Sequence, residues 1–125
     1  MNKPLYILKK SKIRNAGIGA FANQAIKKAQ CLGEYSGKLV TAETFDKMRK
    51  TEYVFQVNKK GKLNHFINGR HGNWITRING AKTKQQEKKV NVESYQYRQK
   101  IYYKTTRPVS KGEEFIVSYG DEYWI

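Results

Sequence analysis

The run that most constrains the fold is Lys111-Gly-Glu-Glu-Phe-Ile-Val-Ser-Tyr-Gly-Asp-Glu-Tyr-Trp-Ile125. After an opening Lys-Gly turn, Phe115, Val117 and Tyr119 are expected on one face of a strand, because side chains alternate between the two faces. Gly120 can adopt backbone angles that other residues avoid, so the strand can end there with the Tyr119 phenol pointing inward. Chain ends usually fray. An end this rich in aromatic residues is therefore expected to be held against the rest of the molecule.

The remainder of the chain consists of short apolar runs separated by turn residues. Strands are expected at 5–8, at 31–40 with a break at Gly37, at 53–58, at 63–67 and within 90–105. The turn at 59–61 predicts a hairpin, and Asn68-Gly69 is a second strong hairpin signal. Many short strands with little helix favour a mainly β domain built of several small sheets.

Helix is expected in one place only. Residues Thr41 to Lys50 carry Phe45 and Met48 three positions apart, and Thr41 is a suitable N-cap. The lysine-rich 80–89 stretch has no apolar periodicity and reads as an exposed loop.

Length and charge limit the function classes. A chain of 125 residues is expected to form one domain over 1–125 with a single modest core. Twenty-five Lys and Arg against ten Asp and Glu give a net charge of +15, which favours nucleic acid, nucleosomes or anionic membranes as neighbours. The other interpretation is a charge that only keeps the protein soluble, since no zinc-finger or RNP-type motif is present.

Cysteine and histidine content argues against a metal centre. Cys31 is the single cysteine, which rules out an internal disulfide and an all-cysteine zinc site. His65 and His71 lie far from it in sequence, so no metal ligands are assigned. No apolar run approaches the length of a membrane span and no signal peptide is evident, so a soluble intracellular protein is expected.

Two glycines flank Ile18 in the stretch Asn15-Ala-Gly-Ile-Gly-Ala-Phe-Ala22. Such a pair serves either a tight turn or the close approach of the backbone to a ligand. The longer glycine fingerprint of dinucleotide folds is absent.

Four separated segments together resemble SET domains, the S-adenosylmethionine-dependent protein lysine methyltransferases. They are Ala16-Gly-Ile-Gly-Ala-Phe-Ala, Leu32-Gly-Glu-Tyr-Ser-Gly, Gly72-Asn-Trp-Ile-Thr-Arg-Ile-Asn-Gly and the closing run 112–124. Where the commonest family pattern has an Asn-His pair, Asn79 is followed here by Gly80, which is more similar to the PR subclass of SET domains. That subclass ranges from active methyltransferases to domains with little activity. The size and the Gly-Asp-Glu-Tyr-Trp ending also resemble the small stand-alone SET proteins of large DNA viruses.

The resemblance implies a SET-domain β-clip of small curved sheets, with one short helix and a C-terminal pseudoknot, and S-adenosyl-L-methionine as the cofactor. It also implies the site residues. The lysine channel would be lined by three tyrosines, Tyr119, Tyr35 and Tyr103, with Tyr119 beside the transferred methyl group. The cofactor would be held by Ala16, Gly17, Ile18, Tyr53, Asn79, Gly80 and Trp124. Trp74 is expected to pack in the core, and the tyrosines have the alternative role of plain core aromatics.

The implied substrate is a lysine-bearing protein tail, with a histone as the usual one. A chain of charge +15 repels a basic peptide at long range, so docking on nucleosomal DNA is expected, with short-range attraction from Glu113, Glu114, Asp121 and Glu122. A nuclear or chromatin location follows if the substrate is a histone, and a homodimer is compatible with the sequence. Two alternatives to the enzyme remain at this point: a SET-like binding module without turnover, and a small basic nucleic-acid-binding protein.

Overall fold

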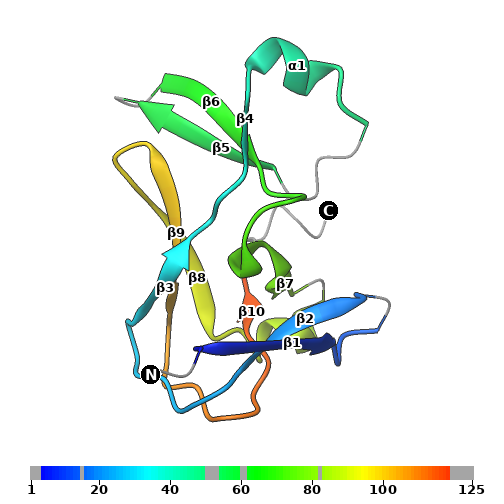
Figure 1. Cartoon of the computed structure of the whole chain (residues 1–125), viewed down its shortest axis with the longest axis vertical. Helices are drawn as coiled ribbons and strands as arrows, with labels where there is room; N and C mark the ends of the chain where they lie inside the picture. Colours follow the sequence, from blue (N-terminus) through cyan, green and yellow to red (C-terminus); the bar gives the residue numbers. More distant parts are fainter. Residues whose placement is uncertain (1–3, 15, 50–53, 60–61, 82, 119–125) are drawn as a thin grey trace.

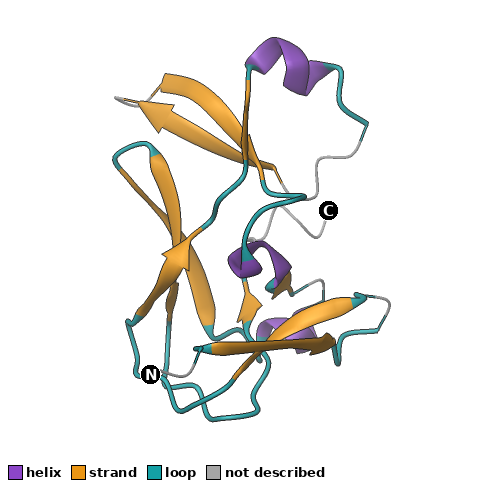
Figure 2. Cartoon of the chain, in the orientation of Figure 1, coloured by secondary structure: helices purple, strands orange, loops and turns teal. Residues whose placement is uncertain are grey.

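The computed structural model describes residues 4–14, 16–49, 54–59, 62–81 and 83–118. In chain order the elements are β1 (Tyr6–Lys10), β2 (Ile18–Ala22), β3 (Cys31–Glu34), β4 (Lys38–Val40), α1 (Ala42–Asp46), β5 (Val54–Lys59), β6 (Lys62–Asn68), the 3-10 helix η1 (Trp74–Arg77), β7 (Asn79–Gly80), α2 (Lys84–Glu87), β8 (Val92–Tyr97), β9 (Lys100–Thr105) and β10 (Ile116–Val117). Short strands dominate and the helices are few and small (Figure 2). The expected mainly β architecture is confirmed.

The strands form three small sheets (Figure 1). β1 and β2 make an antiparallel pair, and β4, β6 and β5 make an antiparallel sheet of three strands with β6 in the middle. The largest sheet has the order β3-β9-β8-β10-β7. Its strands β3, β9 and β8 are antiparallel, whereas β10 runs parallel to both β8 and β7.

β10 is therefore an interior strand, although it comes last among the described elements. Ile116 lies opposite Asn79 and Val117 opposite Gly80. Phe115 and Val117 are fully buried in the main core, while Ile116 packs in a smaller cluster on the other side. The predicted alternation is confirmed over 115–117, with both faces buried. Tyr119 and the threading expected for the closing residues lie outside the described residues.

The main core fills the space between the sheets. η1 contributes Ile75, which is completely buried. The Trp74 ring stacks on Tyr6 with centroids 4.3 Å apart and lies 5.7 Å from the Phe115 ring. Trp74 packs against the core, as expected from the sequence.

The first helix is shorter than predicted. α1 begins after Thr41, whose hydroxyl accepts a hydrogen bond from the Thr44 N–H at 3.1 Å, as the N-cap prediction required. It ends at Asp46 rather than near Lys50. No residue of α1 is buried, and its anchor is the stack of Phe45 on the Phe66 ring at 4.1 Å. Most helix stability in proteins comes from a packed apolar face. Because Phe45 is the one partly buried residue of α1, the helix ends one residue after it.

The prediction of a loop over 80–89 is wrong, because α2 lies within it. The Thr83 hydroxyl accepts a hydrogen bond from the Gln86 N–H at 3.1 Å and caps the helix. Lys, Gln and Glu are good helix formers. α2 has no buried residue, which explains why an apolar pattern could not reveal it.

One predicted hairpin is confirmed and the other is wrong. β5 and β6 pair antiparallel, with Lys59 opposite Lys62, as the expected hairpin requires. At Asn68-Gly69 the chain turns without forming a hairpin: the Asn68 side chain accepts from the Arg70 N–H at 3.1 Å, and the chain continues into η1. The strand expected over 31–40 is divided, since β3 and β4 belong to different sheets.

None of the helices in the described part of the chain has both the length and the apolar character that a membrane span requires.

Candidate functional site

The loop between β1 and β2 presents backbone to solvent at the Gly-x-Gly segment. Gly17 adopts φ 71°, a left-handed conformation that a side chain disfavours. The Ser11 N–H donates to the Gly17 carbonyl at 2.8 Å and closes the loop. Gly17 is exposed, and Ile18 is 52% exposed. A ligand can therefore reach the backbone of this segment.

Asn79 joins this loop from a position 61 residues later in the chain. Its Nδ2 donates to the Ile18 carbonyl oxygen at 3.1 Å. The side chain is partly buried, and the bond uses one of its two amide N–H groups. Two segments assigned to the cofactor from the resemblance, one around Gly17 and one at Asn79 and Gly80, thus lie side by side.

Glu114 is hydrogen-bonded to the same loop. It is 6% exposed, and its carboxylate accepts from the Ser11 hydroxyl at 2.5 Å and from the Lys12 N–H at 2.9 Å. The Ser11 hydroxyl in turn accepts from the Ile13 N–H at 3.0 Å. A Cβ atom at Gly19 would collide with the Glu114 carboxylate. The Glu114 carboxylate is therefore in close contact with the loop and hydrogen-bonded to its first two residues.

Asn91 fixes the segment that carries Glu114. It is fully buried, its Nδ2 donates to the Glu114 carbonyl at 2.9 Å, and its Oδ1 accepts from the Ile116 N–H at 2.8 Å. The same amide group reaches the Glu113 carboxylate at 3.1 Å, and Arg107 pairs with that carboxylate at 2.8 Å. These contacts tie the start of β10 to the start of β8.

The hypothesis that Glu113 and Glu114 attract a basic peptide stays a prediction, although both carboxylates already have partners within the fold. Glu114 is buried and bonded to the loop, and Glu113 is held by Arg107. Partial burial raises the pKa of Glu113, but the hydrogen bonds from the Ser110 N–H, Asn91 and Arg107 outweigh it and leave that pKa below its ordinary value. Asp121 and Glu122 lie outside the described residues.

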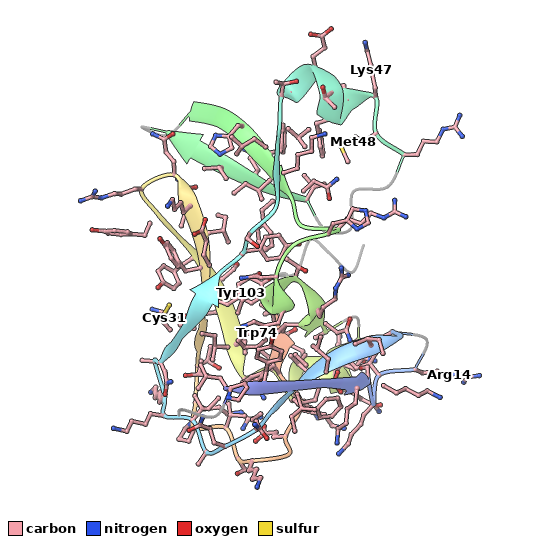
Figure 3. All side chains as sticks on the ribbon, viewed as in Figure 1. Arg14, Cys31, Lys47, Met48, Trp74 and Tyr103 are labelled. Atoms are coloured by element: carbon pink, nitrogen blue, oxygen red, sulfur yellow. The ribbon has the colours of Figure 1, made fainter. Side chains whose placement is uncertain are left out.

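The two described channel tyrosines meet in the core. Tyr35 and Tyr103 are 3% and 1% exposed, and their ring centroids are 5.6 Å apart. Phe55 packs edge-on against both, at 4.6 Å from Tyr35 and 6.0 Å from Tyr103. Figure 3 shows Tyr103 in the middle of the molecule. The aromatic cluster can surround an aliphatic chain, but nearly all of its present surface is covered by protein.

One segment, 69–79, connects the aromatic cluster to the Gly-x-Gly loop. At its start Gly69 lies against the Tyr35 ring, where a Cβ atom would collide with it. In its middle the Asn73 side chain donates to the Glu34 carbonyl at 2.8 Å, and the Asn73 N–H donates to the Ser36 hydroxyl at 2.9 Å. At its end stands Asn79. The two groups of residues assigned from the resemblance are therefore fixed relative to each other through this segment.

Three predicted site residues, Tyr119, Tyr53 and Trp124, lie outside the described residues. The position just before Tyr119 is well anchored, since the Ser118 hydroxyl donates to Glu87 of α2 at 2.7 Å. Gly80 is buried beside Val117 and supplies only backbone. Among the residues that the structure describes, no three His, Cys, Asp or Glu side chains gather as metal ligands.

Sequence reasoning missed the supporting residues Glu114, Ser11 and Asn91. A weak signal existed for Glu114, because it directly precedes three apolar residues of the final strand. Asn91 directly precedes β8 in the same way. Nothing in the sequence links Ser11 to residue 114, since that contact depends on how two distant segments fold together.

Comparison with known proteins decides the family. The family model for the PR domain of PR domain zinc finger protein 2 matches residues 6–125. The chain belongs to the PR domain family. Its assignment to the PR subclass of SET domains is thereby confirmed.

This PR domain also matches curated proteins. It is 28% identical over 106 residues to mouse PR domain zinc finger protein 14, covering 84% of this chain and 18% of that protein. It is 28% identical over 122 residues to the Caenorhabditis elegans histone-lysine N-methyltransferase set-17, covering 95% of this chain and 42% of that protein. The PR domain thus spans less than half the length of either relative.

Solved structures share the fold. The methyltransferase domain of human PR domain-containing protein 2 superposes with a TM-score of 0.77 at 24% identity, covering 97% of this chain and 81% of that one. ctPRC2 bound to S-adenosylmethionine superposes with a TM-score of 0.75 at 22% identity, covering 96% of this chain and 16% of that one. At these identities the likeness concerns the fold.

Proposed function

We propose that this PR domain is an S-adenosylmethionine-dependent protein lysine N-methyltransferase that acts on a histone tail. The observation that carries the proposal is the hydrogen bond from Asn79 to the Ile18 carbonyl, because it joins the two segments expected to hold the cofactor. The name of the set-17 relative and the S-adenosylmethionine in ctPRC2 support the same activity. A nuclear or chromatin location belongs to this proposal.

The described part of the site fits the polar end of S-adenosylmethionine. An ideal Cβ placed on Gly17 would have no atom within 4 Å, so space is open above the backbone there. Ala16, Gly17 and Ile18 would offer backbone groups to the amino-acid part of the cofactor. Asn79 would offer its second side-chain N–H and its Oδ1 atom. At Gly19, in contrast, the Glu114 carboxylate occupies the space that a Cβ atom would need. Tyr53 and Trp124 are proposed to complete the pocket.

When bound, S-adenosylmethionine supplies a methyl group on a positively charged sulfur. The lysine amine must attack in its neutral form, and with an ordinary lysine pKa of about 10.4 that form lies roughly 4–5 kcal/mol uphill at pH 7. A channel with dry aromatic walls lowers the lysine pKa by desolvation, because burial disfavours the charged form. The lysine ammonium group would lose a proton to solvent before the neutral amine attacks the methyl group. This step requires no metal and no acid-base pair from the chain.

Tyr35 and Tyr103 are proposed to form those walls. Their rings and that of Phe55 form one cluster, which suits the methylene groups of a lysine side chain. Tyrosine hydroxyl groups can orient the amine, and Tyr119 is proposed to do so beside the methyl group. The 69–79 segment, which the Asn73 hydrogen bonds hold to Glu34 and Ser36, would set the distance between channel and cofactor, and alignment of this kind contributes up to several kcal/mol to catalysis.

The test is transfer of labelled methyl groups to core histones and to nucleosomes. We expect Tyr119→Phe to reduce labelling strongly while cofactor binding is retained, and Asn79→Ala to weaken cofactor binding measured by calorimetry. The matched control for the tyrosine is Tyr95→Phe, because Tyr95 lies on β8 outside the residues assigned to the site and its hydroxyl reaches the Cys31 sulfur at 3.7 Å. Strong labelling by both site variants would show that the residues are assigned wrongly.

A second candidate is a binding module without turnover. It is favoured by Gly80, which offers no side chain where the commonest SET pattern has histidine. The module predicts recognition of a histone peptide with no measurable affinity for S-adenosylmethionine. Calorimetry with the cofactor alone therefore distinguishes the two candidates.

A further inference from the structure

A cavity of about 540 Å³ opens between the β1–β2 loop and α2. We call it the basic pocket, because its lining includes the four cationic residues Lys12, Arg14, Lys89 and Arg107. None of Ala16, Gly17, Ile18, Asn79 and Gly80 lines it. The basic pocket is therefore distinct from the described part of the candidate methyltransferase site.

The basic pocket keeps a net positive charge, because its lining holds four cationic residues against two carboxylates. Two acidic residues also line it, but Glu114 is bonded to Ser11 and to the Lys12 N–H, and Glu113 is paired with Arg107. Both carboxylates are thus already engaged. The Glu113–Arg107 pair is neutral overall, and the charge of Glu114 offsets one of the three other cations, so the lining has a net charge of +2.

Three of the cations are available to a partner. Ion pairs among the described residues use the cations Lys47, Lys104 and Arg107, so Lys12, Arg14 and Lys89 have no carboxylate partner in that part of the chain. All three are exposed. The Arg14 side chain extends away from the body of the molecule at the β1–β2 loop (Figure 3). Lys12 and Arg14 belong to the β1–β2 loop, and Lys89 lies just after α2. All three line the basic pocket.

We infer that the basic pocket binds the phosphodiester backbone of duplex DNA. Lys and Arg are the side chains that contact phosphate oxygens most often, and such contacts position a protein without reading sequence. The net charge of +15 adds long-range attraction to DNA. An anionic membrane fits less well, because α2 is Lys-Gln-Gln-Glu and presents no apolar residue that could enter a bilayer.

This inference goes beyond the proposed function and does not depend on it. It does explain how a cationic chain could approach a basic histone tail: the DNA contact would hold it on the nucleosome while the tail is captured locally. Its test uses neither S-adenosylmethionine nor histone, so its failure leaves the methyltransferase proposal intact, and the converse also holds.

The experiment measures fluorescence anisotropy of a labelled mixed-sequence duplex of about 20 base pairs over a range of salt concentrations. The pocket variant combines Lys12→Gln, Arg14→Gln and Lys89→Gln. The control variant combines Lys28→Gln, Lys38→Gln and Arg49→Gln, which are exposed residues outside the pocket lining and remove the same total charge.

We expect the pocket variant to lose at least about tenfold in affinity at low salt, and its slope of log K against log salt to fall by up to about 0.9 per lost contact. The control variant should lose less than about threefold, because it removes only long-range attraction. Melting temperatures close to the parent value would show that both variants fold. If the pocket variant is unstable, the single change Lys89→Glu at an exposed position replaces it.

Three outcomes would overturn the inference. Equal losses in the two variants would mean that DNA responds only to total charge. Unchanged affinity in the pocket variant would place the contact elsewhere. Pocket-dependent binding to anionic phospholipid vesicles, without pocket-dependent binding to DNA, would assign the surface to membranes.

Discussion

The buried carboxylate of Glu114 gives the sharpest test of how this fold supports its candidate site. Glu114→Gln keeps the shape of the side chain, but an amide nitrogen cannot accept a hydrogen bond. One of the two donors, Ser11 or Lys12, then loses its acceptor. A hydrogen bond to a charged group contributes about 1.5–3 kcal/mol, so we expect the variant to be destabilised by about that amount. Glu114→Ala removes both acceptors and should cost about 3–6 kcal/mol.

These energies convert into measurable shifts. For a chain of 125 residues, unfolding entropy predicts that each 1 kcal/mol lowers the melting temperature by about 4 °C. Glu114→Gln should therefore melt about 6–11 °C below the parent. Glu114→Ala loses a large part of a total stability that is typically about 5–15 kcal/mol, so the glutamine variant is the more informative one.

The assay combines urea unfolding with calorimetry of S-adenosylmethionine binding. The control is Glu43→Gln, whose side chain is 84% exposed in an i,i+4 pair with Lys47 and should change stability by less than about 0.5 kcal/mol. Because Glu114 holds the Gly-x-Gly loop, the affinity for the cofactor should also fall in the glutamine variant. Equal stabilities of Glu114→Gln and Glu43→Gln would refute the energetic argument. Lost stability with unchanged cofactor affinity would refute the link between the carboxylate and the site.

Three further changes test other parts of the site. Gly69→Ala should displace the Tyr35 ring, cost about 1–3 kcal/mol and alter the near-ultraviolet circular dichroism of the aromatic cluster. Glu113 has a lowered pKa in the folded protein, so the stability it contributes is present above its ordinary value of 4.5 and is lost as pH falls below it; Glu113→Gln should flatten that part of the profile of unfolding free energy against pH. Asn91→Ala leaves a buried backbone N–H and a carbonyl without their side-chain partner and should cost about 2–4 kcal/mol in denaturant unfolding, whereas a loss below 1 kcal/mol would show that water replaces the amide.

Sequence patterns predicted what depends on local alternation and turn chemistry. The run Phe115 to Val117 alternates between two buried clusters because it is a strand with protein on both faces. The hairpin across 59–61 formed where a turn separates two β-rich runs. The resemblance to SET domains led to the correct family, and it assigned the Gly-x-Gly loop and Asn79 to one site, which periodicity alone could not do.

The remaining features depend on contacts between distant segments or on helices without an apolar face. α2 is stabilised by the Thr83 cap rather than by burial, so hydrophobic periodicity gave no sign of it. The role of Glu114 could not be predicted, because Ser11 lies 103 residues away. Glu113 and Glu114 suggested attraction for a basic peptide, and the sequence did not reveal that Glu114 is buried and that Glu113 pairs with Arg107.

The interior position of β10 has a consequence for how the protein is made. β7 has β10 as its one neighbour in the sheet over the described residues, and β8 has an unfilled edge until residues 116 and 117 arrive. During synthesis the edges of β7 and β8 stay unpaired until β10 has left the ribosome. Exposed strand edges of this kind promote aggregation. The soluble yield of this domain in cells should therefore depend strongly on chaperone supply.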